Sequence, residues 1–91
     1  NRKATAKAFL LRVSAYQVSF FQRYKEYASS LSELGLLPNE NLTAHYNFQL
    51  SKVNEPSGID GYSIKATPIN SDESQVLWLD HLGQTSLNWN D

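Results

Sequence analysis

The stretch NRKATAKAFLLRVSAYQVSFFQRYKEYA, residues 1–28, decides the fold. It contains no proline and no glycine, the residues that most often interrupt a helix. Apolar side chains recur in steps of three and four, as on one face of an α-helix. This row comprises Phe9, Val13, Tyr16, Phe20, Tyr24 and Tyr27. A second row widens the face and comprises Leu10, Gln17, Phe21, Tyr24 and Ala28. We therefore expect one long helix over 1–28 that packs on the rest of the chain.

Length and composition bound the architecture. The 91 residues are enough for one domain with one core, and eleven aromatic side chains supply much of it. Residues 1–28 have a charge of +5 and residues 29–91 a charge of −6. This asymmetry fits either an interaction surface or a solvated helix face. The absence of cysteine excludes disulfides, thiolate catalysis and Cys-zinc sites.

A connecting loop is expected over residues 29–41. Ser30 and Glu33 have the spacing of a capping box, Gly35 suits a left-handed stop, and Pro38 prevents a helix from continuing. These features predict a single helical turn at 31–34. Four leucines should hold the loop on the core, namely Leu31, Leu34, Leu36 and Leu37.

The hydrophobic period changes to two from Leu42 onward. Alternation predicts strands over 42–50 and 62–67, and apolar content predicts further strands over 75–80 and 85–89. The short connections imply antiparallel pairing. The predicted fold class is α+β: an N-terminal long α-helix packed on a four-stranded antiparallel β-sheet over 42–89, all within one domain of residues 1–91.

The sequence predicts no catalytic, cofactor or metal site. His45 and His81 are far apart in the chain, and Asp80 beside His81 falls in a turn, where adjacent residues do not form a triad. Two scattered histidines do not supply the three or four donors that zinc requires. The polar turn with Asp72 and Glu73, or Asp60 near Gly58 and Gly61, offers oxygen ligands for calcium, but without the spacing of an EF-hand.

Nucleic-acid binding is a competing interpretation of the helix. Its cations are interleaved with aromatics and comprise Arg2, Lys3, Lys7, Arg12, Arg23 and Lys25. The aromatics follow the period of a core face, so packing explains them more simply than base stacking does. The acidic strand region would repel phosphate. On these grounds we rank DNA low among the expected partners.

Three motifs follow one another in the chain. The first combines QVSFF at 17–21 and Tyr27 with LSELG at 31–35. The second is YSIKATP at 62–68, and the third runs from Gln75 to Gly83 with LWLD at 77–80. Together, over about residues 17–89, they resemble the motifs of type IV pilins, especially PilE-type minor pilins.

This resemblance implies a structural subunit, not an enzyme. Such a subunit assembles with other pilin subunits and the pilus assembly machinery into a filament for adhesion, twitching motility or DNA uptake. The precursor would be anchored in the inner membrane of a bacterial envelope by a hydrophobic half-helix before Asn1, and would then enter the extracellular pilus. A pseudopilin of a type II secretion system and a DNA-binding pilin of natural transformation stay open as alternatives.

The resemblance also divides the helix into two expected faces. The face toward the chain's own sheet comprises Phe9, Val13, Tyr16, Phe20 and Tyr24. The face toward neighbouring subunits comprises Leu10, Leu11, Ser14 and Val18.

Pilins of this type usually have a disulfide near the C-terminus. Gln75 and Trp89 stand near those two positions here. We therefore expect packing and strand pairing alone to hold the C-terminal region.

Overall fold

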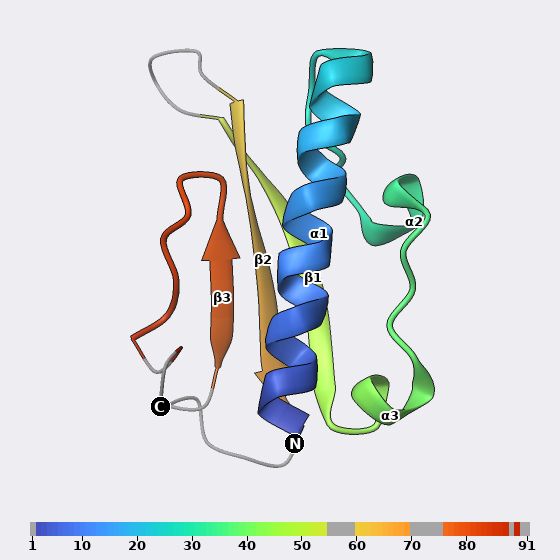
Figure 1. The fold of residues 1–91 in the computed structure, drawn as a ribbon, viewed down its shortest axis with the longest axis vertical. Coiled ribbons are helices and arrows are strands. Elements are labelled where there is room, and N and C mark those ends of the chain that lie inside the picture. Colours follow the sequence, from blue (N-terminus) through green and yellow to red (C-terminus); the bar gives the residue numbers. More distant parts are fainter. Residues whose placement is uncertain (1, 55–59, 70–75, 88, 90–91) are drawn as a thin grey trace.

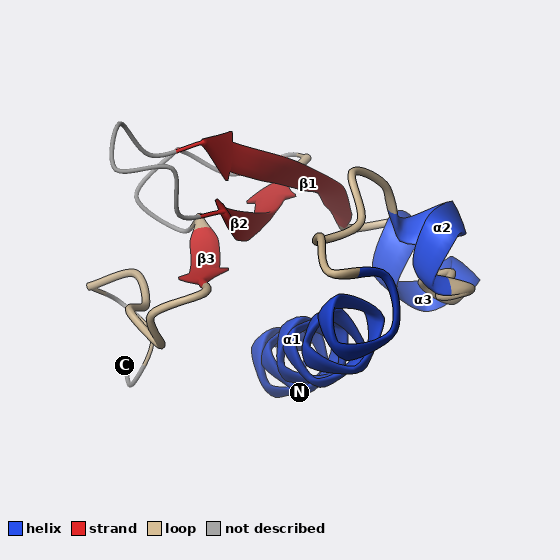
Figure 2. Ribbon diagram, turned by 90° about the horizontal axis from the view of Figure 1, so that it is seen from above, coloured by secondary structure: helices blue, strands red, loops and turns tan. Residues whose placement is uncertain are grey.

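The computed structural model describes residues 2–54, 60–69, 76–87 and 89 of the chain. Its helices are α1 (Arg2–Tyr24), α2 (Leu31–Leu34) and α3 (Glu40–Thr43), and its strands are β1 (Tyr46–Asn54), β2 (Asp60–Pro68) and β3 (Leu77–Asp80). The strands form one antiparallel sheet in the order β1-β2-β3. α1 lies on one face of this sheet, with α2 and α3 to one side (Figures 1 and 2). The predicted α+β class is confirmed.

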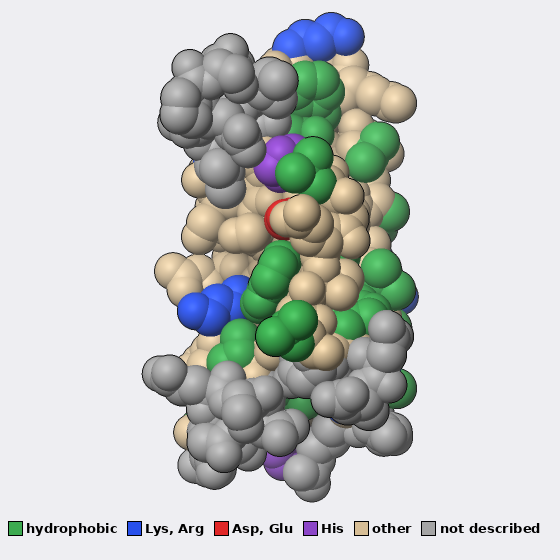
Figure 3. Space-filling view, turned by 90° about the vertical axis from the view of Figure 1, so that its left-hand side faces the viewer, with side chains coloured by type: hydrophobic (Ala, Val, Ile, Leu, Met, Phe, Trp, Pro, Cys, Tyr) green, Lys and Arg blue, Asp and Glu red, His purple; other side chains and the backbone are tan. Residues whose placement is uncertain are grey.

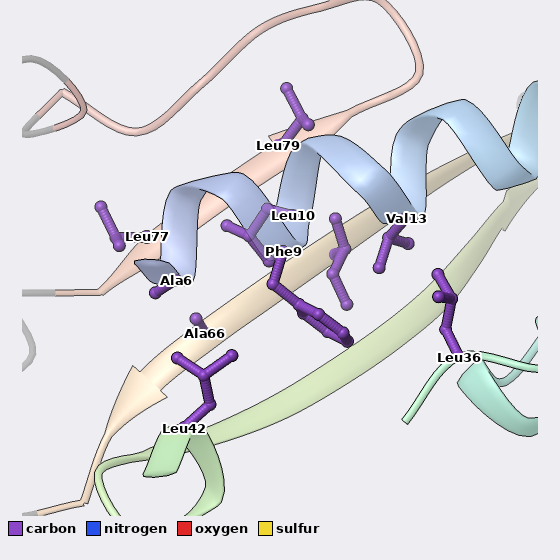
Figure 4. Close-up of a cluster of buried hydrophobic side chains, with 10 residues drawn as sticks. Ala6, Phe9, Leu10, Val13, Leu36, Leu42, Ala66, Leu77 and Leu79 are labelled. Carbon is purple, nitrogen blue, oxygen red and sulfur yellow. The ribbon is translucent and has the colours of Figure 1, made fainter. Parts of the chain in front are cut away.

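The core lies between α1 and the sheet (Figure 4). α1 contributes one line of side chains, and β2 and β3 contribute those that point toward it. The buried cluster comprises Ala6, Phe9, Leu10, Val13, Leu36, Leu42, Ile64, Ala66, Leu77 and Leu79. Burying each of the larger side chains contributes about 1.5–3 kcal/mol, so this cluster is a main stabilising term of the fold.

α1 ends at Tyr24, four residues before the predicted end. Lys25 adopts a left-handed backbone with a φ of 63°, and its N–H donates to the carbonyl of Phe21 at 2.7 Å. A residue in this conformation cannot continue a right-handed helix. The chain therefore reverses at Lys25 and returns toward α2 (Figure 1).

Gln17 fixes this returning segment. Its Nε2 donates to the carbonyl of Ala28 at 3.0 Å, and its Oε1 accepts from the N–H of Ala28 at 2.8 Å. Both residues are fully buried. The backbone groups of Ala28 have lost water as a partner, and the Gln17 amide replaces it. This pairing explains why a polar residue stands in the apolar stripe of the helix.

The predicted helical turn at 31–34 is confirmed as α2. The side chain of Ser30 accepts from the N–H of Glu33 at 3.4 Å, and Gly35 ends the turn with a φ of 72°. Leu36 is buried, and Leu31 and Leu34 pack against the core. Leu37 is 80% exposed, so the expectation that it holds the loop on the core is wrong.

The first strand begins later than predicted. Residues 42 and 43 belong to α3, where the Asn39 side chain accepts from the N–H of Leu42 at 2.9 Å and caps the turn. Leu42 is buried from this helical turn, so its apolar character does not require a strand. β1 instead runs from Tyr46 to Asn54 and pairs along its whole length with β2.

The predicted fourth strand is wrong within the described residues. Only an isolated bridge joins Leu79 to Thr85, flanked by the hydrogen bond from Ser86 N–H to the Trp78 carbonyl at 3.1 Å. Beyond it the N–H of Trp89 donates back to the Ser86 carbonyl, so the chain turns and leaves the sheet. The described part of the sheet therefore has three strands.

Lys7 holds the C-terminal segment against α1. Its Nζ donates to the carbonyl of Trp89 at 2.8 Å and lies 5.7 Å from the centre of the Trp89 ring. A cation over an indole face is an attractive contact. The expectation that packing and strand pairing alone hold this region is therefore wrong, although Gln75 lies outside the described residues.

Tyr62 joins α1 to the sheet through its hydroxyl, which lies 2.6 Å from the Ser14 hydroxyl. The side chain of Tyr62 is 2% exposed, and the Tyr27 ring packs edge-on against it at 4.9 Å. Burial raises the pKa of Tyr62 above the ordinary value of 10.0, while the hydrogen bond with Ser14 acts in the opposite direction.

We expect the free energy of unfolding to fall as the pH rises above 10.0. The raised pKa of Tyr62 in the folded state means that its stabilising contribution is complete below the unfolded pKa and is lost as the pH passes through the folded pKa. Tyr62→Phe should lessen this fall. Urea unfolding across that pH range measures it, with Tyr16→Phe on the exposed side of α1 as the control. Equal pH profiles for Tyr62→Phe and the wild type would contradict the assignment.

Gln17→Ala should destabilise the fold by roughly 2–4 kcal/mol, because it leaves the buried N–H and carbonyl of Ala28 without partners. Equilibrium urea unfolding measures the change. Gln22→Ala is the matched control, since Gln22 is an exposed glutamine on the same helix. It should change stability by no more than about 0.5 kcal/mol. Similar losses of stability in both variants would show that the Ala28 hydrogen bonds contribute little.

Candidate interaction surfaces

α1 exposes an uncharged line of residues away from the sheet. Its members recur in alternating steps of four and three and therefore share one side of the helix. This α1 stripe comprises Ala4, Ala8, Leu11, Ala15, Val18 and Gln22, all exposed. Leu11 is 54% and Val18 51% exposed. A row of small and apolar side chains of this length suits close packing against a second helix.

The face expected to meet the sheet is displaced around the helix. Phe9 and Val13 are buried, as expected, but Tyr16 and Tyr24 are 44% and 55% exposed. Together with the half-buried Phe20 they line a hollow of about 230 Å³ between α1 and α2. The buried line of α1 is instead made of Ala6, Leu10, Val13 and Gln17.

The face expected to meet neighbouring subunits is only partly exposed. Leu11 and Val18 lie in the α1 stripe. Leu10 is fully buried in the core, and Ser14 bonds to Tyr62, so the expectation for these two residues is wrong. Both residues lie on the sheet side of the helix: Leu10 belongs to the buried line of α1, and Ser14 meets Tyr62 of β2.

Three cations lie at one end of the molecule. Arg23 and Lys25 are at the end of α1, and Lys52 is near the end of β1, on the same side (Figure 1). All three are exposed. The guanidinium of Arg23 lies 5.6 Å from the centre of the Tyr24 ring. We call these three residues the basic end. Clustered cations of this kind raise the local concentration of anionic partners.

The face of the sheet opposite α1 has a groove beside β3. Lys65 on β2 is the register partner of Trp78 on β3, and both point away from the core residues Ile64 and Leu79. No described helix covers this face (Figure 2). The outer groove has a volume of about 350 Å³, and its lining includes Tyr62, Ser63, Lys65, Trp78, His81 and Gln84.

Figure 3 looks onto the β3 side of the molecule, where histidine, lysine and hydrophobic groups lie close together. Sequence reasoning did not find the groove. In the sequence, the groove is indicated by the alternation of Ser63, Lys65 and Thr67 on the polar side of β2. That alternation does not show which strand lies opposite.

The turn after β3 closes one end of the outer groove. The Oδ1 of Asp80 accepts from the N–H of Leu82 at 3.0 Å and from that of Gln84 at 2.8 Å. The N–H of His81 donates to the Tyr62 carbonyl at 3.1 Å. The His81 ring fills the space where any side chain on Gly61 would begin, so another residue at position 61 would displace that ring. Asp80 and His81 thus shape the turn.

The other candidate ligand residues do not come together. His45 lies just before β1, not on it as expected, and its carbonyl accepts from the N–H of Ile69 at 3.0 Å. Among the described residues no group of three or more histidine, aspartate or glutamate side chains could hold a metal ion. The Asp72–Glu73 turn lies outside those residues.

Comparison with known proteins gives the family. Across the described ranges, no helix combines the length and apolar character needed to cross a membrane. The family described as "Type IV minor pilin ComP, DNA uptake sequence receptor" matches residues 1–76. A type IV pilin structure from Shewanella oneidensis superposes with a TM-score of 0.69 and 26% sequence identity, over 94% of this chain and 88% of that one. No curated protein matches the chain.

The matched family covers all of α1, the α2–α3 loop, β1 and β2. The TM-score shows that the similar structure shares the fold of this chain, a long N-terminal helix packed on an antiparallel sheet. Family and fold are those of structural subunits of the bacterial cell envelope and the extracellular pilus. The chain therefore belongs to the ComP family of type IV minor pilins.

Proposed function

We propose that this minor pilin binds duplex DNA during uptake while it is held among other pilin subunits. The observation that carries the DNA part is the family match, whose description is that of a DNA uptake sequence receptor. That match weighs against the low rank that charge counting gave to DNA. Anchoring of a precursor in the inner membrane is part of the same proposal.

The α1 stripe supports assembly with neighbours. It is long, uncharged and exposed, and it points away from the sheet that covers the opposite side of the helix. A filament requires contacts in which one patch of a subunit meets a different patch of the next. No observation favours a pseudopilin over a pilus subunit, and the matched family is a pilus family.

The basic end supports the contact with DNA. Arg23 and Lys25 at the end of α1 and Lys52 on β1 are all exposed, so they can neutralise several phosphates at once. They lie outside the α1 stripe, which leaves them accessible when the stripe is covered. Phosphate contacts position a protein on duplex DNA without reading its sequence.

Leu11→Glu should leave the domain folded and exclude it from pili, because a charge would be buried in the middle of a helix contact. The thermal midpoint should stay within a few degrees of the wild-type value, since Leu11 is 54% exposed. Immunoblots of sheared pili measure incorporation. Leu37→Glu, at an exposed leucine in the loop, is the matched control and should be incorporated normally. Pili that contain the Leu11→Glu subunit at wild-type levels would refute the assignment of the stripe.

The double variant Lys25→Ala, Lys52→Ala should bind duplex DNA more weakly. The slope of log K against log salt should fall in magnitude by about 1 for each phosphate that the protein no longer neutralises. Fluorescence anisotropy of a labelled duplex over a salt series measures both. Arg12→Ala is the control, an exposed cation on α1 outside the basic end. Equally weakened binding in the control and the double variant would show that overall charge, not the basic end, attracts DNA.

A further inference from the structure

We propose that the outer groove binds one unpaired nucleotide of a DNA strand, with its base stacked on Trp78 and its phosphate on Lys65. This inference rests on the DNA-binding function proposed above. It adds a second kind of contact, with a base that has left the duplex stack or lies in a single strand.

The stacking surface comes from the register of the sheet. Trp78 and Lys65 are direct cross-strand partners, so their side chains leave the sheet as neighbours on one face. Trp78 is half-buried in the groove wall and outside the core. An indole in this position can stack with any base, because every base has a π-face.

The groove also offers hydrogen-bonding groups of both kinds. The Ser63 hydroxyl and the Gln84 amide each donate and accept. The carboxylate of Asp80 is fixed by the two backbone N–H groups bound to its Oδ1, which leaves Oδ2 to accept from an exocyclic amino group. Unpaired bases present both donors and acceptors on their edges. A volume of about 350 Å³ is within the range of pockets for small ligands.

The charge of the groove separates its role from that of the basic end. Lys65 and Asp80 compensate one another, so the groove has no net attraction for a polyanion. A base inside a duplex cannot reach such a pocket without leaving the stack. Lys52 and the groove lie on opposite faces of the sheet, because Lys52 is the register partner of Tyr62, whose hydroxyl meets Ser14 of α1. The groove is therefore a separate contact for a single strand.

The test compares a short thymidine single strand with a fully paired duplex of equal length. Each DNA is titrated into the 91-residue chain carrying Trp89→Phe, in which Trp78 is the remaining tryptophan. The single strand should quench Trp78 fluorescence in a saturable way, and the duplex should not. Trp78→Ala should weaken single-strand binding, measured by anisotropy, about tenfold or more and leave duplex binding within about twofold. Tyr16→Ala removes an exposed aromatic elsewhere and should affect neither.

A second measurement covers the case in which Trp78→Ala does not fold. Thymidine 5′-monophosphate should then shift the backbone amide resonances of Ser63, Lys65 and Gln84 in the wild-type chain, and Lys65→Ala should reduce those shifts. Absence of quenching and of these shifts, or equally weakened binding in Trp78→Ala and Tyr16→Ala, would overturn the inference. Duplex binding without any groove response would leave the proposed function standing, whereas no binding of either DNA would overturn both.

Discussion

The fold depends on the two hydrogen bonds between the Gln17 side chain of α1 and the backbone of Ala28. The reversal at Lys25 brings the backbone of Ala28 against the side of α1 that must stay dry. An apolar residue at position 17 would bury two unpaired peptide groups there, each at a cost of about 1–3 kcal/mol. The Gln17 amide pairs with both groups at once. The segment that it fixes then brings Tyr27 against Tyr62, so one amide links the helix, the loop and the sheet.

This arrangement divides the surface of the molecule into separate regions. α1 meets the sheet along the line through Leu10 and Gln17, so the α1 stripe points away from it. Because α1 covers only one face, the other face of β2 and β3 stays open for the outer groove. Because β1 and α1 end on the same side, cations from both meet at the basic end (Figure 1). Three surfaces thus result from one choice of helix face.

Features that depend on neighbouring residues along the chain can be predicted from the sequence. The presence of a long helix at the start of the chain follows from its helical period, although its end at Tyr24 does not, and the cap of α2 follows from the spacing of Ser30 and Glu33. Leu42 fits a strand and a helical turn equally well, and the Asn39 cap decides in favour of the turn. The prediction of a fourth strand is wrong where Lys7 holds the chain at Trp89. That contact joins residues 82 positions apart and leaves no local pattern in the sequence. The outer groove likewise depends on which strand lies opposite Lys65.

The low rank that the charge count gives to DNA disagrees with the family match, and the positions of the charges supply a physical reason. The acidic total of residues 29–91 includes groups that lie far from the basic end. Glu40 in α3 is near the opposite end of a molecule 36 Å long (Figure 1). Screening at physiological salt limits the effect of an exposed charge to about 8 Å, so Glu40 does not weaken attraction at Lys25 or Lys52. Two acids lie nearer to the basic end: Glu26 follows Lys25 in the chain, and Glu33 lines the same hollow as Arg23. The position of each charge, and not its sum over a segment, decides where a phosphate backbone can approach.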